Sequence, residues 1–220
     1  MPEVTPLDPA TVTVDSLGPW WDVALAGYAA HNPTVPLDPL AEFVAAQHAD
    51  AVAGAMSRPL LAGVRDPPSG APVGFLSGSL PQRENTHLLV LANLVVHPHH
   101  RRRGIGSALL AHAARVARAD RRRVVSLTAV EPVGSDGADV AGTRFARAAG
   151  AVGTALEVRG TLRLPAGPTQ PEPLSAMQPE PVAAGYELLT WVDATPSELV
   201  EQRIALAWRC RPIRRRSSPA

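Results

Sequence analysis

The most constraining feature of the sequence is a continuous apolar run that leads into a basic, glycine-containing turn. Residues 87–96 read HLLVLANLVV, a composition expected of a strand that is covered on both faces. The following residues, 97–106, read HPHHRRRGIG, and residues 107–120 then carry alanine, leucine and valine at helical spacing. The sequence therefore predicts a buried strand, a turn and a helix in the middle of the chain.

The turn combines three kinds of group that bind anions. The first turn of a helix presents unpaired backbone N–H groups and a partial positive charge. Gly104 and Gly106 lack a Cβ atom, so phosphate oxygens can approach the backbone closely. Arg101, Arg102 and Arg103 add permanently charged guanidinium groups around the same point. These properties fit a pyrophosphate group.

Other interpretations of the turn are weaker. A P-loop needs a lysine, and all 21 basic residues of this chain are arginine. A Rossmann turn needs glycine or alanine where Leu109 stands. A metal site is not expected, because His97, His99 and His100 have no carboxylate or cysteine partner at a ligand spacing. A strand, turn and helix with a merely solvated arginine run remains the alternative.

Further elements are expected on both sides of this unit. Hydrophobic periodicity, turn residues and helix-start signals predict them. In chain order they are a short strand, a Gly-Pro break and a helix within 11–30, a helix at 37–55, a hairpin of strands at 59–66 and 71–80, a strand at 124–130, a helix at 139–149 and a strand pair at 151–164.

The turn matches a motif of arginine or glutamine, two residues, glycine, one residue, and glycine or alanine. Arg101, Gly104 and Gly106 fill these positions in order. The sequence here resembles the GNAT family of N-acetyltransferases, whose acetyl-CoA-binding motif has this form. The order of elements from residue 11 to 164 agrees with that family. The resemblance implies an α/β (mixed α+β) GNAT acyltransferase fold, with a central mixed sheet flanked by helices.

The resemblance also implies a co-substrate and a reaction. The co-substrate is acetyl-CoA, without a metal, and an acyl group passes directly to an amine acceptor. Backbone groups of residues 95–97 would accept the pantetheine arm. The expected coenzyme A-binding residues are Leu94, Val95, Val96, His97, Arg101, Arg102, Arg103, Gly104, Ile105, Gly106 and Ser107. The sequence does not specify which amine is the acceptor.

The catalytic groups are harder to assign. An ammonium acceptor must lose its proton before it attacks, so a general base is required. Glu84, before the central strand, and Glu131, after the next strand, are the candidate bases, with His97 or a water relay as alternatives. The tyrosine that often serves as acid in the family falls at Ala146 here, beside Phe145. The alternative function is therefore a catalytically inactive acyl-CoA-binding or regulatory domain of a tandem GNAT protein.

The domain organisation follows from composition. Residues 5–165 are expected to form the GNAT domain, and the proline-rich residues 166–182 a linker. Residues 183–209 resemble the start of a second GNAT domain of actinobacterial tandem acetyltransferases, which suggests a truncated or frame-shifted tandem protein. Residues 210–220 are expected to be a disordered basic tail.

Charge and composition exclude several classes of protein. The net charge of +1 argues against nucleic acid as a partner. The sequence has neither a membrane-length apolar run nor a signal-peptide pattern, so a cytoplasmic protein without a membrane partner is expected. The single cysteine, Cys210, excludes an intramolecular disulfide. A homodimer remains open, because such folds often dimerise.

Overall fold

The computed structural model describes residues 2–30, 37–52, 54–131, 137, 140–153, 189–192 and 194–209. The chain divides into two compact units, Met1–Thr161 and Leu162–Ala220. The elements of the first unit are β1 (Thr5–Leu7), α1 (Val14–Ala29), α2 (Leu40–Ala51), β2 (Ser57–Arg65), β3 (Pro72–Pro81), β4 (Leu88–Val96), η1 (Pro98–His100), α3 (Ile105–Ala119), β5 (Val124–Leu127) and α4 (Ala141–Ala148).

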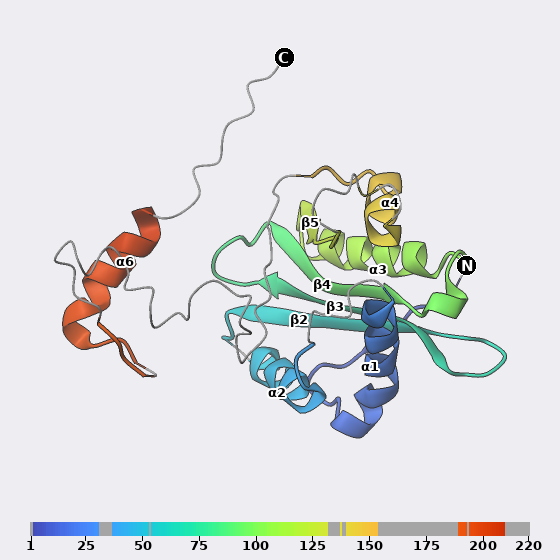
Figure 1. Cartoon of the computed structure of the whole chain (residues 1–220), viewed down its shortest axis with the longest axis horizontal. Coiled ribbons are helices and arrows are strands. Elements are labelled where there is room, and N and C mark those ends of the chain that lie inside the picture. The colour runs from blue at the N-terminus through green and yellow to red at the C-terminus, as the bar shows by residue number, and fades with distance from the viewer. Residues whose placement is uncertain are drawn as a thin grey trace, which may run out of the picture. The chain divides into compact units, whose positions relative to one another are not determined.

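The first unit is built on one five-stranded sheet with the strand order β1-β2-β3-β4-β5 (Figure 1). The first four strands are antiparallel to their neighbours, whereas β5 runs parallel to β4. The predicted hairpin is the β2–β3 pair, and the predicted central strand is β4. The expectation of a mixed sheet flanked by helices is confirmed.

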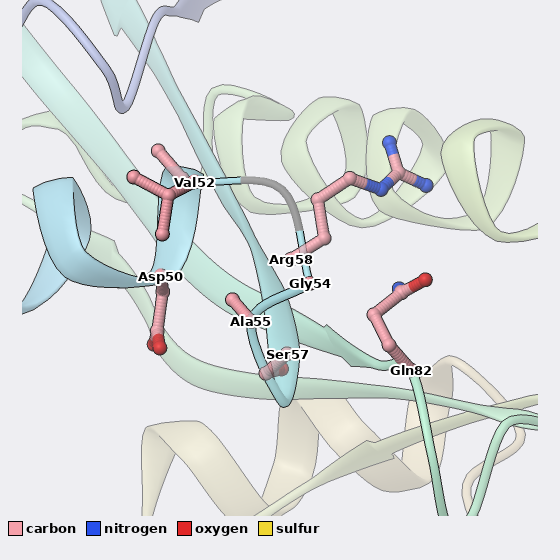
Figure 2. Close-up of a pocket in the computed structure, with 8 residues that line it drawn as sticks. Asp50, Val52, Gly54, Ala55, Ser57, Arg58 and Gln82 are labelled. Atoms are coloured by element: carbon pink, nitrogen blue, oxygen red, sulfur yellow. The ribbon is translucent and has the colours of Figure 1, made fainter.

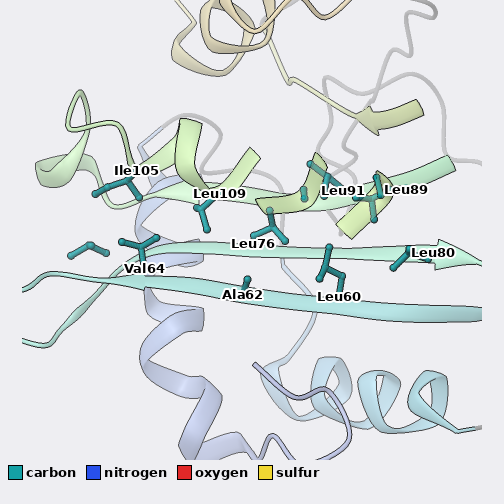
Figure 3. Packing of buried hydrophobic residues seen from close by; sticks show 12 residues of the cluster. Leu60, Ala62, Val64, Leu76, Leu80, Leu89, Leu91, Ile105 and Leu109 are labelled. Carbon is teal, nitrogen blue, oxygen red and sulfur yellow. The ribbon is translucent and has the colours of Figure 1, made fainter. Parts of the chain in front are cut away.

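Helices cover both faces of this sheet. Helices α1 and α2 pack on one face, where Trp20, Trp21 and Phe75 form part of a buried cluster. Helix α3 covers the other face through Ile105 and Leu109 (Figure 3). Those two side chains belong to one buried cluster with apolar residues of three strands: Leu60, Ala62, Val64, Val73, Leu76, Leu80, Leu89 and Leu91. Because both faces are covered, β4 needs the continuous apolar composition seen in the sequence.

The N-terminal segment differs from the prediction. The described strand is β1, at Thr5–Leu7, and α1 then continues through the expected Gly-Pro break at Gly18 and Pro19. Thr13 starts the helix with a capping box: its hydroxyl accepts from the Ser16 backbone N–H at 3.1 Å, and its own N–H donates to the Ser16 hydroxyl at 2.8 Å. Pro19 removes one helical hydrogen bond. Burial of Trp20 and its neighbours on the apolar face of α1 offsets this loss.

The remaining predictions have mixed outcomes. Strand β5 is shorter than expected and ends at Leu127. The segment 183–209, expected to begin a second domain, contains η2 (Ser197–Leu199) and α6 (Val200–Arg209). The strand pair predicted in 151–164 lies largely outside the described residues, as do the linker and the basic tail. None of the described helices is long and apolar enough to cross a membrane.

Candidate active site

Strand β4 has an edge that β5 leaves uncovered. The two strands pair from Leu88 and Val124 to Leu91 and Leu127, and there the pairing ends. Strand β4 continues to Val96, and its last residues pair only with β3 among the described strands. The backbone N–H and C=O groups on the other side of this stretch can bind an extended ligand.

A bulge lies where the two strands part. Ser77 of β3 is opposite Asn93, and Gly78 is opposite Leu91, so Ala92 has no partner on β3. A bulge of this kind shifts the alternation of side chains along a strand. Leu89 and Leu91 therefore belong to the cluster under α3, whereas Asn93 lies on the α1 face of the sheet.

Asn93 is part of a polar network that the sequence analysis missed. Its Nδ2 donates to the Ser77 hydroxyl at 2.7 Å, and its Oδ1 accepts from the Tyr28 hydroxyl at 3.0 Å. Asn93 is 7% exposed and Ser77 is 2% exposed. A polar residue within an otherwise apolar strand needs such partners. Asn93 in the run LLVLANLVV is the sequence signal that could have indicated this network.

The turn after β4 leads directly into α3. The His97 N–H donates to the Val73 carbonyl at 2.9 Å and extends the β3–β4 pairing, while Arg101 Nε donates to the Val96 carbonyl at 3.4 Å. Gly104 precedes the helix with φ of 79°, a left-handed conformation that glycine adopts without strain. The end of β4 and the N-terminus of α3 are thereby held together.

Most of the predicted coenzyme A-binding residues are brought together here. Gly104, Ile105, Gly106 and Ser107 form the start of α3, whose first N–H groups have no partner within the helix. Arg102 and Arg103 are exposed, and Arg101 is half-buried. Leu94, Val95, Val96 and His97 form the end of β4 and the residue after it.

Gly106 has a packing role besides the predicted one. A Cβ atom at this position would lie 3.3 Å from Phe145 Cε2 of α4 and 3.7 Å from Val96 Cγ2 of β4. Its missing side chain therefore lets α3, α4 and β4 meet at one point. Gly104 is the more open of the two, since the nearest atom to a Cβ there would be Pro2 Cδ at 3.9 Å.

His97 lies between the open edge and the turn. Its Nδ1 is buried and has no hydrogen-bond partner in the described part of the chain. Desolvation, together with the positive charges of His99, His100 and Arg101, lowers the pKa of His97 below its ordinary value. The ring is therefore neutral at neutral pH. Within the described ranges, no group of three metal-binding side chains comes together.

The structure separates the two candidate bases. Glu84 is exposed in the β3–β4 loop before β4 begins, so it lies at the opposite end of that strand from the arginine turn. Glu131 follows β5 and is half-buried, and its Oε2 accepts from the Thr143 hydroxyl at 3.0 Å. Glu131 thus ties the chain after β5 to α4. Ala146, at the expected tyrosine position, is buried in α4.

The end of the sheet that carries the β3–β4 loop is closed by an arginine. The buried side chain of Arg122 donates to the Pro81 and Thr86 carbonyls at 2.6 Å each, and to Asp120 Oδ2 at 2.7 Å. Asp120 also pairs with Arg58 at 2.7 Å. Since its donors are engaged within the protein, Arg122 is a structural residue.

An open pocket of about 240 Å³ lies beside Arg58, between the end of α2 and the start of the β3–β4 loop (Figure 2). Its lining includes Asp50, Ser57 and Gln82. Because this pocket is at the end of the sheet that carries the β3–β4 loop, it is separate from the arginine turn at the other end of β4.

The geometry agrees with comparisons to known proteins. The model of the GNAT acetyltransferase family matches residues 28–136. A solved tandem GNAT protein from the clavulanic acid biosynthesis pathway is 31% identical with a TM-score of 0.54, over 68% of this chain and 43% of that one. The chain thus spans less than half the length of that tandem protein. No curated protein matches the sequence.

More distant structures share the fold. The acetyltransferase AAC(6')-Iy, solved with a bisubstrate analogue, is 15% identical with a TM-score of 0.50, over 74% of this chain and 99% of that one. An aminoglycoside acetyltransferase from an uncultured soil metagenomic sample, solved with sisomicin, is 16% identical with a TM-score of 0.51, over 73% and 96%. With the family match, the tandem relative and the open β4 edge beside the arginine turn, the chain belongs to the GNAT family of acetyltransferases.

Proposed function

We propose that this chain binds acetyl-CoA along the open edge of β4 and transfers its acyl group to an amine. The observation that carries the proposal is the continuity of three features. The uncovered part of β4 ends at Val96, the arginine turn follows at once, and α3 starts at Ile105 with unpaired N–H groups. An extended amide-containing arm and a pyrophosphate need these two kinds of site in this order.

Each part of the site has a distinct role in binding. The N–H groups of Ile105, Gly106 and Ser107 would hold the pyrophosphate, and the guanidinium groups of Arg101 to Arg103 would neutralise its charge. The β4 backbone from Leu94 to Val96 would pair with the pantetheine arm. The thioester makes the acyl group susceptible to attack by an amine. The chain's contribution is to hold it beside the acceptor and exclude water.

The catalytic base remains a proposal with two residues, Glu84 and Glu131. Glu131 lies near α4 but already accepts a hydrogen bond from Thr143. Glu84 lies in the β3–β4 loop, at the end of β4 that is far from the arginine turn. These placements favour direct transfer to an amine that arrives unprotonated. They also support the second candidate function, a binding or regulatory half of a tandem GNAT protein, together with the buried Ala146 in place of a tyrosine.

The domain assignment, with a GNAT domain at 5–165, a linker at 166–182 and the start of a second domain at 183–209, also remains a proposal. The tandem relative supports it, since the chain is similar to less than half of that protein. We further propose that the protein acts in the cytoplasm, where acetyl-CoA is available.

Calorimetric titration with acetyl-CoA tests binding. The wild-type chain should bind with micromolar affinity, and a variant with Gly104→Glu and Arg101→Ala should not bind. Arg118→Ala, which removes an exposed arginine from the last turn of the same helix, is the control and should bind normally. No binding by a folded wild-type chain would remove the coenzyme A assignment.

Thiol release from acetyl-CoA then separates the two candidate functions. The acceptor panel is spermidine, sisomicin, a peptide with a free N-terminus and a lysine-containing peptide with a blocked N-terminus. Release with any of these amines supports an acetyltransferase. Binding without release, for these acceptors, favours the binding or regulatory function.

A further inference from the structure

The polar network at the β4 bulge lies where the reacting group of a bound acyl-CoA would be. This step rests on the proposed function. From Val96 back to Ala92 the open edge covers four steps along the strand, about 13 Å at roughly 3.3 Å per step. An arm that starts at the pyrophosphate turn and follows this edge reaches the bulge, where β5 begins to pair. The acyl end of the ligand is therefore expected beside Ala92 and Asn93.

Helix α1 places Tyr28 at this point from the opposite face of the sheet to α3. Gly27 packs so closely on Val95 that a Cβ atom there would overlap the valine side chain. The next residue, Tyr28, is half-buried, and its hydroxyl donates to Asn93 Oδ1 at 3.0 Å. The C-terminal turn of α1 thus holds a phenol against the part of β4 that β5 does not cover.

The network holds this hydroxyl in one orientation. Asn93 is 7% exposed, and its amide group is fixed on its other side by the Ser77 hydroxyl at 2.7 Å. A buried amide with two satisfied partners rarely changes its orientation, because breaking either bond leaves a polar atom unpaired. An apolar side chain at position 93 would fill the same space without any such requirement. A buried polar residue at position 93 is therefore less favourable for stability than an apolar one, which supports a functional role for Asn93.

We propose that Tyr28 is a catalytic residue of the acyl transfer, whose hydroxyl is oriented by Asn93 and accepts a hydrogen bond from the attacking amine. A tyrosine hydroxyl can donate one hydrogen bond and accept others through its oxygen lone pairs. By accepting an N–H, it directs the nitrogen lone pair toward the thioester carbon. Asn93 acts through Tyr28 and is a positioning residue.

The reaction balances with the groups named. The amine nitrogen forms the new C–N bond, and the C–S bond breaks with its electron pair on sulfur. The proton that the nitrogen loses is taken up by the departing thiolate, which gives an amide and a free thiol. Tyr28 keeps its own proton throughout, so no strong base is needed near β4.

Fluorine NMR tests the location without knowledge of the acceptor. The sequence has two tyrosines, so a Tyr186→Phe chain labelled with 3-fluorotyrosine carries one probe, at Tyr28. Acetyl-CoA at saturation should shift this resonance, whereas adenosine 3′,5′-bisphosphate, which lacks the pantetheine arm, should leave it in place. Saturating acetyl-CoA without a shift overturns the role of Tyr28 but not the proposed function. No binding by calorimetry overturns both.

Kinetics with a stability-matched variant test the role itself. Tyr28→Phe leaves Asn93 Oδ1 without its partner, and Ser77→Ala leaves Asn93 Nδ2 without its partner, so both should lower Tm. Tyr28→Phe alone removes the hydroxyl from the acceptor side. With the fastest amine of the panel it should lower kcat/KM for that amine by about 10-fold to 100-fold, with the acetyl-CoA Kd unchanged. Equal losses of kcat/KM in the two variants would mean that the network contributes to stability alone. If no amine reacts, the fluorine NMR result decides whether Tyr28 lies beside the acyl group.

Discussion

Two arginine triplets lie at the two ends of α3, and the structure uses them in opposite ways. In the first, Arg102 and Arg103 are exposed around the unpaired N–H groups at the start of the helix. In the second, Arg122 is buried, and its guanidinium donates to Pro81, Thr86 and Asp120. The residue type is the same. Burial and the presence of internal acceptors distinguish a ligand-binding arginine from one that closes a hairpin.

The comparison shows why a run of like charges is a weak signal by itself. The first triplet precedes a helix, where it adds to the positive end of the helix dipole and attracts an anion. The second follows a helix, where carbonyl and carboxylate oxygens from the chain itself are available. An arginine that the folded chain surrounds with acceptors has a structural role. An arginine beside unpaired backbone donors is available to bind an anion.

The largest expected effect is on the second triplet. Arg122→Ala leaves two backbone carbonyls without their side-chain donor and Asp120 with Arg58 as its remaining partner, and should lower the free energy of unfolding by about 3 kcal/mol. Denaturant unfolding measures the change. Arg123→Ala, at an exposed position, is the control and should change stability by less than about 0.5 kcal/mol. A normal stability for Arg122→Ala would break the comparison.

The first triplet should respond in binding and not in stability. Replacing Arg102 and Arg103 together by alanine should weaken acetyl-CoA binding by about tenfold at low salt, since two exposed charges are removed from the anion site. The difference from wild type should shrink as salt screens the remaining charges. Calorimetry at two salt concentrations measures it. A loss of stability with unchanged affinity would reverse the roles of the two triplets.

Gly104 sharpens the comparison, because it sets the geometry of the first triplet. Its φ of 79° is strained for any residue with a side chain, so Gly104→Ala should lower the free energy of unfolding by about 1 kcal/mol. The matched control is Gly142→Ala in α4, where a Cβ atom would meet no other atom within 4 Å. That change should leave stability the same or slightly higher. Thermal unfolding of both variants gives the answer.

The smallest expected effect is on the pH dependence of Tm, where the histidines and Asp120 should act in different pH ranges. Desolvation, with nearby positive charges, lowers the pKa of His97 and of His112 below the ordinary 6.5. The folded state then binds fewer protons than the unfolded state, so stability should fall as pH drops from about 6.5 toward the folded pKa values. His97→Gln and His112→Gln should each flatten part of this fall in Tm.

Asp120, whose partner Arg122 closes the β3–β4 loop, should affect Tm at lower pH. Burial opposes ionisation of Asp120, but the hydrogen bonds and charges of Arg122 and Arg58 hold the pKa of Asp120 below its ordinary 3.8. Its contribution is present above about pH 4 and is lost as pH falls through the folded pKa. Asp120→Asn should lower Tm by a constant amount above about pH 5, and the difference from wild type should shrink as the pH falls through the folded pKa of Asp120. A difference from wild type that changes with pH near pH 6 would contradict the separation.

Local sequence signals were sufficient for β4, the arginine turn and α3, because each depends on neighbouring residues. The motif at Arg101, Gly104 and Gly106 also led to the right family. The contact between Tyr28 and Asn93 joins residues 65 positions apart, so no periodicity or spacing reports it. The role of Arg122 likewise depends on carbonyls of Pro81 and Thr86, which only the folded chain brings near.

The segment before α1 illustrates a different failure. The prediction took the pair Gly18 and Pro19 as a break, which is the usual meaning of such a pair. Burial of the tryptophans beside it keeps the helix intact, and the capping box at Thr13 begins it earlier. Tertiary packing therefore overrode a local signal.

The unpaired Ala92 gives β4 a change of parity halfway along its length. Residues before it follow one odd–even rule and residues after it follow the reverse. Point substitution leaves the extra residue in place, whereas deletion of that one alanine would pair Leu91 and Asn93 with the adjacent Gly78 and Ser77 and keep the neighbouring side chains on their present faces. A relative without this extra residue would keep the same apolar and polar linings and lose only the local bend and the irregular pairing that the bulge gives β4.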